Sequence, residues 1–178
     1  MAFDHGASYG MAFMVNGTLQ RYEQNNLKKE DSLKEFYNAV TGRVIYWQPD
    51  VIVIEKINVA GTTFGGNNVV RLAELRAIIK LVCEERGIKC VEVNPTTMKK
   101  YITGYGKATK REVAEVLGAT YGIDADEICK PEYYVKGDKK GQVKKYIAEA
   151  SDAIALAHYV YETEYMKDFP RKKFYEIR

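Results

Sequence analysis

The sequence has few or none of several features on which particular classes of protein depend. Its three cysteines, Cys83, Cys90 and Cys129, are an odd number and form no CxxC pair, so we expect neither a disulfide framework nor a zinc site. No apolar run is long enough to span a bilayer, and the N-terminus has no signal-peptide pattern. We therefore expect a protein of a reducing, cytoplasmic compartment, with no membrane partner.

The composition that remains is ordinary for a globular protein. The 178 residues suit a single domain over 1–178 with a full-sized core. Hydrophobic residues make up 46% and charged residues 29% of the chain. The net charge of +3 permits an anionic partner without requiring one, so the placement of the lysines matters more than their number.

Two acids lie within an otherwise apolar late segment, Ile147–Ala157, which predicts a helix continuing toward Tyr165. Glu149 and Asp152 are three residues apart, so their side chains share one face of that helix. Two neighbouring carboxylates lose several kcal/mol on burial unless a cation compensates their charge. The pair therefore indicates a divalent cation, which carboxylate oxygens bind well.

The N-terminal half has the pattern of an α/β protein. Met1–Asp4 is a short apolar run that ends in an acid, and Tyr9–Val15 and Thr18–Tyr22 flank an Asn-Gly pair typical of a β-hairpin. Val51–Glu55 begins with four β-branched residues, which predicts a central strand covered on both faces. If the two acid-terminated strands are neighbours, Asp4 and Glu55 converge at the sheet edge where α/β proteins usually place their sites.

The remaining segments continue the alternation of helices and strands. The apolar spacing and the capping residues predict helices over Ser32–Trp47, over Val69–Arg86, from Pro95, and from Thr109 to about Leu117, and a strand at Lys89–Val93. The stretch Asn58–Asn68 is a loop rich in Gly, Thr and Asn. Residues 124–145 form a Lys-rich segment that we expect to be an irregular, solvated loop, and the tail 167–178 is basic and aromatic.

The four acids predict a particular chemistry. The candidate ligands are all carboxylates, from Asp4, Glu55, Glu149 and Asp152, with no His or Cys among them. The expected ion is therefore Mg²⁺, with Mn²⁺ as a substitute, and not Zn²⁺. Two such ions roughly 4 Å apart suit in-line phosphoryl displacement by water. The substrate would then contain phosphodiesters.

Basic residues near a Gly-Tyr-Gly loop are the expected contacts to a nucleic-acid backbone. They are Lys99, Lys100, Lys107, Lys110 and Arg111. Phe64 lies at the centre of the loop 58–68, where loop packing and insertion between bases are equally good interpretations.

Four segments, taken in order, resemble the motifs of the RuvC family of Holliday-junction resolvases. They are residues 3–8 (FDHGAS), 52–55 (IVIE), 99–106 (KKYITGYG, with Lys110) and 149–157 (EASDAIALA). The resemblance implies a ribonuclease H-like α/β fold with a five-stranded mixed sheet flanked by helices. It also implies a homodimer in which the helix over 68–86 packs against its mate.

The same resemblance implies an activity and a partner. A Mg²⁺-dependent endodeoxyribonuclease, with two ions in each active site, would nick four-way DNA junctions in recombination and repair. Its products would carry 5′-phosphate and 3′-hydroxyl ends.

The sequence departs from the family pattern at four points. Glu149 stands where aspartate is usual, His5 stands where proline is frequent, and Asn58 stands where an aromatic residue often wedges into the junction, a role that Phe64 could take over. The Lys-rich segment is also longer than expected. These differences favour a divergent branch with looser DNA choice, found in a bacterial cell or, for a bacteriophage protein, in the infected host.

Three alternatives remain open beside this interpretation. One is a nuclease of the same fold acting on branched DNA, forks or RNA–DNA hybrids, and another is a non-catalytic junction-binding protein. An ATPase of related fold is disfavoured because the chain has no Gly-rich phosphate loop.

Overall fold

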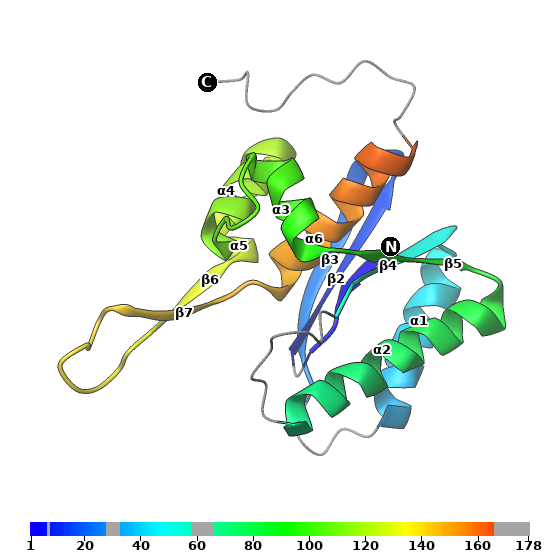
Figure 1. Cartoon of the computed structure of the whole chain (residues 1–178), viewed down its shortest axis with the longest axis horizontal. Helices are drawn as coiled ribbons and strands as arrows, with labels where there is room; N and C mark the ends of the chain where they lie inside the picture. Colours follow the sequence, from blue (N-terminus) through cyan, green and yellow to red (C-terminus); the bar gives the residue numbers. More distant parts are fainter. Residues whose placement is uncertain (7, 28–32, 58–65, 166–178) are drawn as a thin grey trace.

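A computed structural model of the chain describes residues 1–6, 8–27, 33–57 and 66–165 (Figure 1). Its main sheet has five strands in the order β3-β2-β1-β4-β5. The strands are β1 (Ala2–Asp4), β2 (Ser8–Val15), β3 (Thr18–Asn26), β4 (Val51–Glu55) and β5 (Lys89–Val93). Strand β2 is antiparallel to both of its neighbours, β1 and β3, whereas β1, β4 and β5 are parallel. The predicted five-stranded mixed sheet is therefore confirmed.

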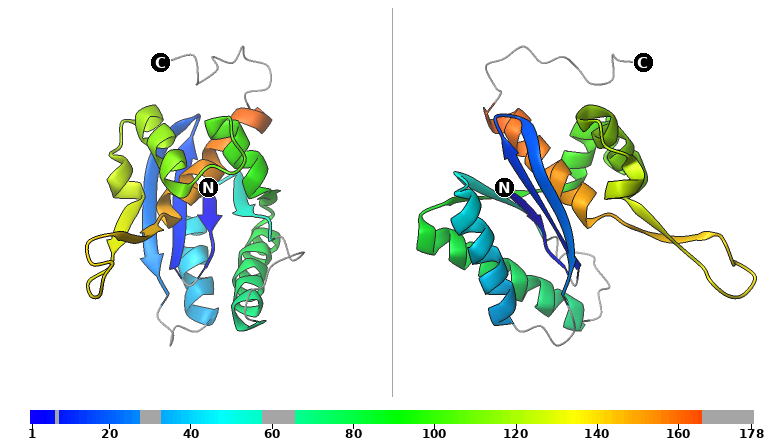
Figure 2. Two further views of the ribbon diagram at one scale, coloured as in Figure 1. Left: turned by 60° about the vertical axis from the view of Figure 1, so that its left-hand side comes forward. Right: turned by 180° about the vertical axis from the view of Figure 1, so that it is seen from behind.

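Helices cover both faces of this sheet (Figure 2). Helices α1 (Leu33–Trp47) and α2 (Gly66–Arg86) pack against one face, where Ile52 and Ile54 of β4 are fully buried. Helix α6 (Glu149–Val160) lies on the other face with Val53 in its core. Because alternate residues of β4 enter two different cores, this strand needs the run of β-branched residues that predicted it.

Turn and capping residues fix the element ends as the sequence predicts. Asn16 and the glycine after it have positive φ angles of 48° and 79°, as the tight β2–β3 hairpin requires. The side chain of Asn94 caps α3 (Pro95–Thr103), and Thr109 forms a capping box with Glu112 at the start of α4 (Lys110–Tyr121). Helix α4 continues one turn beyond the predicted end at Leu117.

The prediction of an irregular loop over 124–145 is wrong. This segment contains α5 (Ala125–Ile128) and a two-stranded antiparallel sheet of β6 (Lys130–Tyr133) and β7 (Val143–Ile147). The hairpin projects away from the rest of the molecule in every view (Figures 1 and 2). Most of its side chains are exposed, so its sequence has no hydrophobic alternation from which strands could be predicted.

Some predicted features cannot be compared with the structure. Asn58, Phe64 and the tail 167–178 lie outside the described residues. After α6 the chain continues as a π-helical turn, η1 (Tyr161–Tyr165), so the predicted continuation toward Tyr165 is confirmed. Among the described helices, none is long and apolar enough to cross a membrane.

Candidate active site

Two acids meet where β1 and β4 end. The strands are parallel neighbours with Phe3 opposite Ile54, so the next residues, Asp4 and Glu55, lie side by side at the carboxyl edge of the sheet. Burial, together with the charges of Asp152 and Glu55, raises the pKa of Asp4 well above its usual value. Burial and Asp152 likewise raise the pKa of Glu55. These carboxyls therefore lie close enough to disfavour one another's ionisation.

Helix α6 brings the other two acids to the same edge. It can do so because β2 has a glycine beneath its first turn: a Cβ on Gly10 would lie 1.7 Å from the carbonyl oxygen of Glu149. Asp152, one turn further along, is only 8% exposed. All four predicted acids thus lie together, although sequence spacing alone linked only Glu149 with Asp152.

Ser8 holds one of these carboxylates in place. Its Oγ donates a hydrogen bond of 2.7 Å to Oε1 of Glu149. The other carboxylate oxygen, Oε2, is buried and has no hydrogen-bond partner among the described residues. Sequence reasoning missed this role of Ser8, because nothing in the local pattern shows that the start of β2 lies beside α6.

Lys110 is the cation in direct contact with Asp152. Its Nζ donates a hydrogen bond of 2.7 Å to Oδ2 of Asp152. Burial disfavours the ammonium, but the attraction of Asp152, Asp4 and Glu149 outweighs it and raises the pKa of Lys110. Lys110 therefore remains charged and offsets part of the repulsion among the acids. It had been predicted as a phosphate contact, and the structure places it in direct contact with an acid.

The other predicted DNA-contact residues fall into two groups. Lys99 donates its Nζ to the carbonyl oxygen of Ala108 at 3.0 Å, and Arg111 pairs with Glu115 at 2.8 Å and with Asp126. The charge of Arg111 is thus already compensated within the protein. Lys100 and Lys107 are exposed and lie on α3 and on the loop that follows it.

The donor chemistry of the site suits a hard divalent cation. Four carboxylates supply oxygen ligands, and the buried Oε2 of Glu149 is an acceptor without a donor. As they stand, however, no three acidic, histidine or cysteine side chains of the described residues are arranged to hold an ion. Lys110 already donates to Oδ2 of Asp152, so a cation that used this oxygen would compete with the ammonium.

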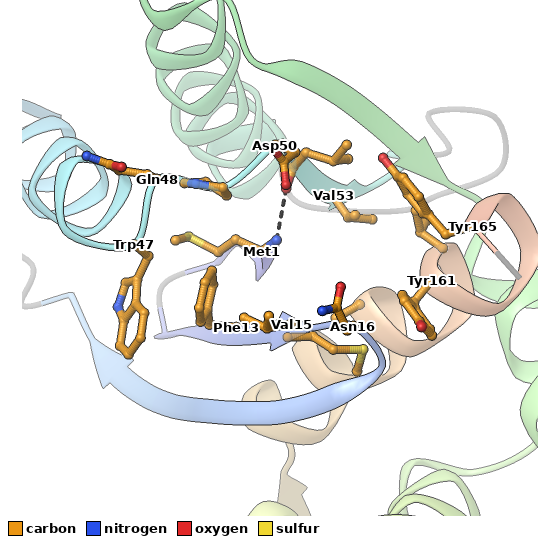
Figure 3. A pocket seen from close by; sticks show the side chains of 15 residues that line it. Met1, Phe13, Val15, Asn16, Trp47, Gln48, Asp50, Val53, Tyr161 and Tyr165 are labelled. Carbon is orange, nitrogen blue, oxygen red and sulfur yellow. Dashed lines mark hydrogen bonds between the residues drawn. The ribbon is translucent and has the colours of Figure 1, made fainter.

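A separate cavity of about 330 Å³ lies at the opposite edge of the sheet, near the start of β1 and β4 (Figure 3). Its lining is largely apolar and aromatic, including Phe13, Trp47 and Tyr161, and it contains none of the four acids. The Met1 amino group donates to the Val51 carbonyl oxygen at 2.8 Å beside it. We therefore take the cluster of acids, and not this cavity, as the candidate active site.

Known proteins resemble this chain in both sequence and fold. Residues 7–129 match the family model described as crossover junction endodeoxyribonuclease RuvC. That segment contains Glu55 and Lys110 but not the other three acids. The RuvC proteins of Caldicellulosiruptor saccharolyticus and Thermomicrobium roseum are 29% identical over 108 residues and 30% identical over 92 residues. These matches cover 61% and 52% of this chain, and 62% and 55% of the two relatives, so under two thirds of each relative is spanned.

Solved structures extend the similarity of fold to most of the chain. RuvC of T. thermophilus in complex with a Holliday junction substrate superposes with a TM-score of 0.64 over 89% of this chain and 90% of that one, at 15% identity. The yeast mitochondrial Holliday junction resolvase Ydc2 gives a TM-score of 0.54 over 88% and 74% of the two chains, at 14% identity. At such low identity the superpositions establish a shared fold and nothing about individual residues.

Proposed function

The chain belongs to the RuvC family of crossover junction endodeoxyribonucleases, and on that premise we propose that it is a divalent-metal-dependent endonuclease that nicks four-way DNA junctions. The observation that carries the proposal is the convergence of Asp4, Glu55, Glu149 and Asp152 at one edge of the sheet. Four acids so close together, two of them with raised pKa values, are costly for stability. Such a cost is typical of residues kept for their chemistry.

The four carboxylates are the proposed ligands of two Mg²⁺ ions, with Mn²⁺ as a substitute. Ions bound there would activate the attacking water and stabilise the leaving 3′ oxygen. Because Ser8 holds Oε1 of Glu149, the buried Oε2, which has no partner among the described residues, is the oxygen that would be available to bind an ion. The products would be 5′-phosphate and 3′-hydroxyl ends at the nick.

Lys110 has two positions in this proposal. Without a divalent cation its ammonium compensates the charge of Asp152. With a divalent cation compensating the acids, the ammonium of Lys110 would be available to bind a non-bridging oxygen of the phosphodiester, where a positive charge would stabilise the transition state. The exposed Lys100 and Lys107 are proposed to contact the DNA backbone further from the reacting phosphate.

We also propose that two copies of the chain act together, since a two-fold dimer suits the symmetry of a four-way junction. Helix α2 is the proposed dimer element. It buries Leu75 and Ile79 in the core but leaves Val70 and Leu81 on its outer side, 58% and 46% exposed. Light scattering of the purified protein, with and without junction DNA, measures the assembly directly.

A substrate panel tests the proposed activity. An immobile four-way junction, a fork, linear duplex and an RNA–DNA hybrid would be end-labelled and incubated with the wild type or with Asp152→Asn. We expect paired symmetric nicks on the junction that require Mg²⁺ and disappear in the variant. Equal cutting of fork and junction would indicate a relaxed branch nuclease. Cutting of the hybrid alone, or binding without cleavage in Mg²⁺ and Mn²⁺, would overturn the proposal.

A further inference from the structure

The β6–β7 hairpin lies outside the part of the chain that matches the family model. The match ends at residue 129, and β6 begins at Lys130. The two strands pair only with each other and project from the body of the protein (Figures 1 and 2). An isolated pair of strands gains little stability by itself. A projecting arm of this kind therefore calls for an explanation beyond the stability of the fold.

The charge of the hairpin differs from that of the rest of the chain. Residues 130–147 contain six lysines and only two acids, a net charge of +4, whereas the whole chain has a net charge of +3. The remainder of the protein is thus close to neutral at −1. A positive arm on a nearly neutral body is suited to a polyanion such as DNA.

Most of the uncompensated charge lies at the far end of the arm. Near the base, Glu132 pairs with Lys144 at 2.8 Å and with Lys145 at 3.3 Å. Lys139 lies over the ring of Tyr134, 5.9 Å from its centroid. Lys136 and Lys140 are exposed, and no carboxylate of the described residues lies within ion-pair distance of either.

The base of the arm is fixed to the candidate active site. Lys130 pairs with Ile147 in the ladder, and Glu149 follows only two residues after the end of β7. At the usual rise per residue of a strand, the tip lies roughly 20 Å from this base, or about six base pairs along a duplex. A two-stranded ribbon also has the width that the major groove admits.

We propose that the β6–β7 hairpin grips a duplex arm of the DNA substrate about six base pairs from the reacting phosphate. Lys136 and Lys140 contact the phosphates, while Tyr133 and Val135, 50% and 78% exposed, lie against sugars and base edges. The proposal rests on the proposed nuclease function and adds to it a binding subsite away from the chemistry.

The test compares two double variants that each remove two exposed positive charges. Lys136→Gln/Lys140→Gln changes the tip, and Lys34→Gln/Lys89→Gln changes two exposed lysines outside α2, at the start of α1 and of β5. Junction binding is measured in EDTA at several salt concentrations. A second junction carries neutral methylphosphonates roughly four to eight base pairs from the cleavage site, and a third carries them more than about 14 base pairs away.

We expect the tip variant to bind the ordinary junction about tenfold more weakly. Its plot of log K against log salt should be shallower than that of the wild type, by about 2 in the magnitude of the slope. On the junction neutralised near the site, the wild type and the tip variant should bind alike, because the phosphates they would contact carry no charge. The control variant and the distally neutralised junction should behave as wild type.

A failure of the hairpin proposal is distinguishable from a failure of the proposed function. If the wild type nicks junctions in Mg²⁺ but the tip variant keeps its affinity and salt slope, the hairpin is not a DNA contact and the proposed function stands. If the tip variant loses affinity equally on all three junctions, the contact does not lie at the proposed distance. If the wild type neither binds nor nicks junctions, the proposed function itself fails.

Discussion

The ammonium of Lys110 and the carboxylate of Asp152 lie 2.7 Å apart, although 42 positions separate the two residues in the sequence. This contact joins the start of α4 to the first turn of α6. It places one positive charge among four acids. The stability of the metal-free protein therefore depends on the Lys110 ammonium, which a bound metal ion would replace. The stability of the two states should therefore respond differently to the loss of Lys110.

Replacing Lys110 by Gln should destabilise the metal-free protein by about 1 kcal/mol, because the nearly buried Asp152 loses its partner while the lysine itself is half exposed. Adding Mg²⁺ should raise the melting temperature more in the variant than in the wild type, because Mg²⁺ no longer competes with the Lys110 ammonium for Asp152. Thermal unfolding with and without Mg²⁺ measures both effects. Arg111→Gln, which removes the neighbouring charge, should leave the Mg²⁺ gain unchanged, and an equal gain in all three proteins would contradict the competition.

Replacing Ser8 by Ala should slow junction cleavage roughly tenfold under single-turnover conditions, with little change in DNA affinity. The reason is that Glu149 loses the 2.7 Å hydrogen bond that fixes its Oε1, and ligand-orienting partners of this kind typically matter by 10- to 100-fold. Ser8→Thr, which retains a hydroxyl, should recover part of the rate. Ser151→Ala is the matched control, because its buried Oγ has no partner among the described residues. Equal rates for the two alanine variants would show that the Ser8 contact has no role in cleavage.

Replacing Gly10 by Ala should prevent α6 from docking normally on β2. The new Cβ would lie 1.7 Å from the Glu149 carbonyl oxygen, a backbone atom that cannot move without shifting the helix. We expect a loss of stability of 3 kcal/mol or more, by analogy with severe overpacking, together with loss of cleavage. Gly42→Ala in α1 meets no atom within 4 Å and should instead stabilise by roughly 0.5–1 kcal/mol. Urea unfolding distinguishes the two, and a stable, active Gly10→Ala protein would mean that β2 and α6 are further apart than described.

The sequence predicted the main sheet because each strand has a local signal. The β-branched run of β4 and the Asn-Gly turn between β2 and β3 are determined within a few residues. The hairpin over 130–147 has no such signal, because most of its side chains are exposed and its sequence therefore has no alternation of apolar and polar residues. Helix capping was equally predictable, because Asn94 and Thr109 bond to their own helices.

The candidate site was predictable only in part, for a related reason. Its acids are conspicuous because they interrupt apolar segments, so residue type alone identified them. The contacts that orient them join distant positions: Ser8 to Glu149 and Gly10 to the α6 backbone. These depend on how α6 lies across β2, which no local pattern specifies. Arg111, whose predicted contact with DNA stays a prediction, pairs with Glu115 and Asp126 of its own protein, and its pairing with Asp126 could not be read from the local pattern.

The two histidines should make the fold sensitive to acid. His158 is 4% exposed, and burial lowers its pKa from 6.5 to about 4. Between these two values the unfolded chain binds a proton that the folded chain does not, so stability falls as pH falls through this window. For a single histidine shifted this far, the free energy of unfolding falls by about 2 kcal/mol between pH 7 and pH 5. The Gln variant of His158 should therefore lose about 2 kcal/mol less than the wild type over that interval.

Urea unfolding at pH 7 and pH 5 measures this difference. His5, whose pKa burial and Arg76 also lower to about 4, remains in the variant and accounts for a residual acid sensitivity of similar size. Tyr121→Phe is the matched control: it removes the hydroxyl that lies 2.8 Å from Nδ1 of His158 but keeps the partly buried ring, so its pH dependence should stay close to that of the wild type. If His158→Gln and the wild type lost the same stability between pH 7 and pH 5, His158 would have to titrate at its ordinary pKa, and the α6–α4 contact around it would be open to water in the folded protein.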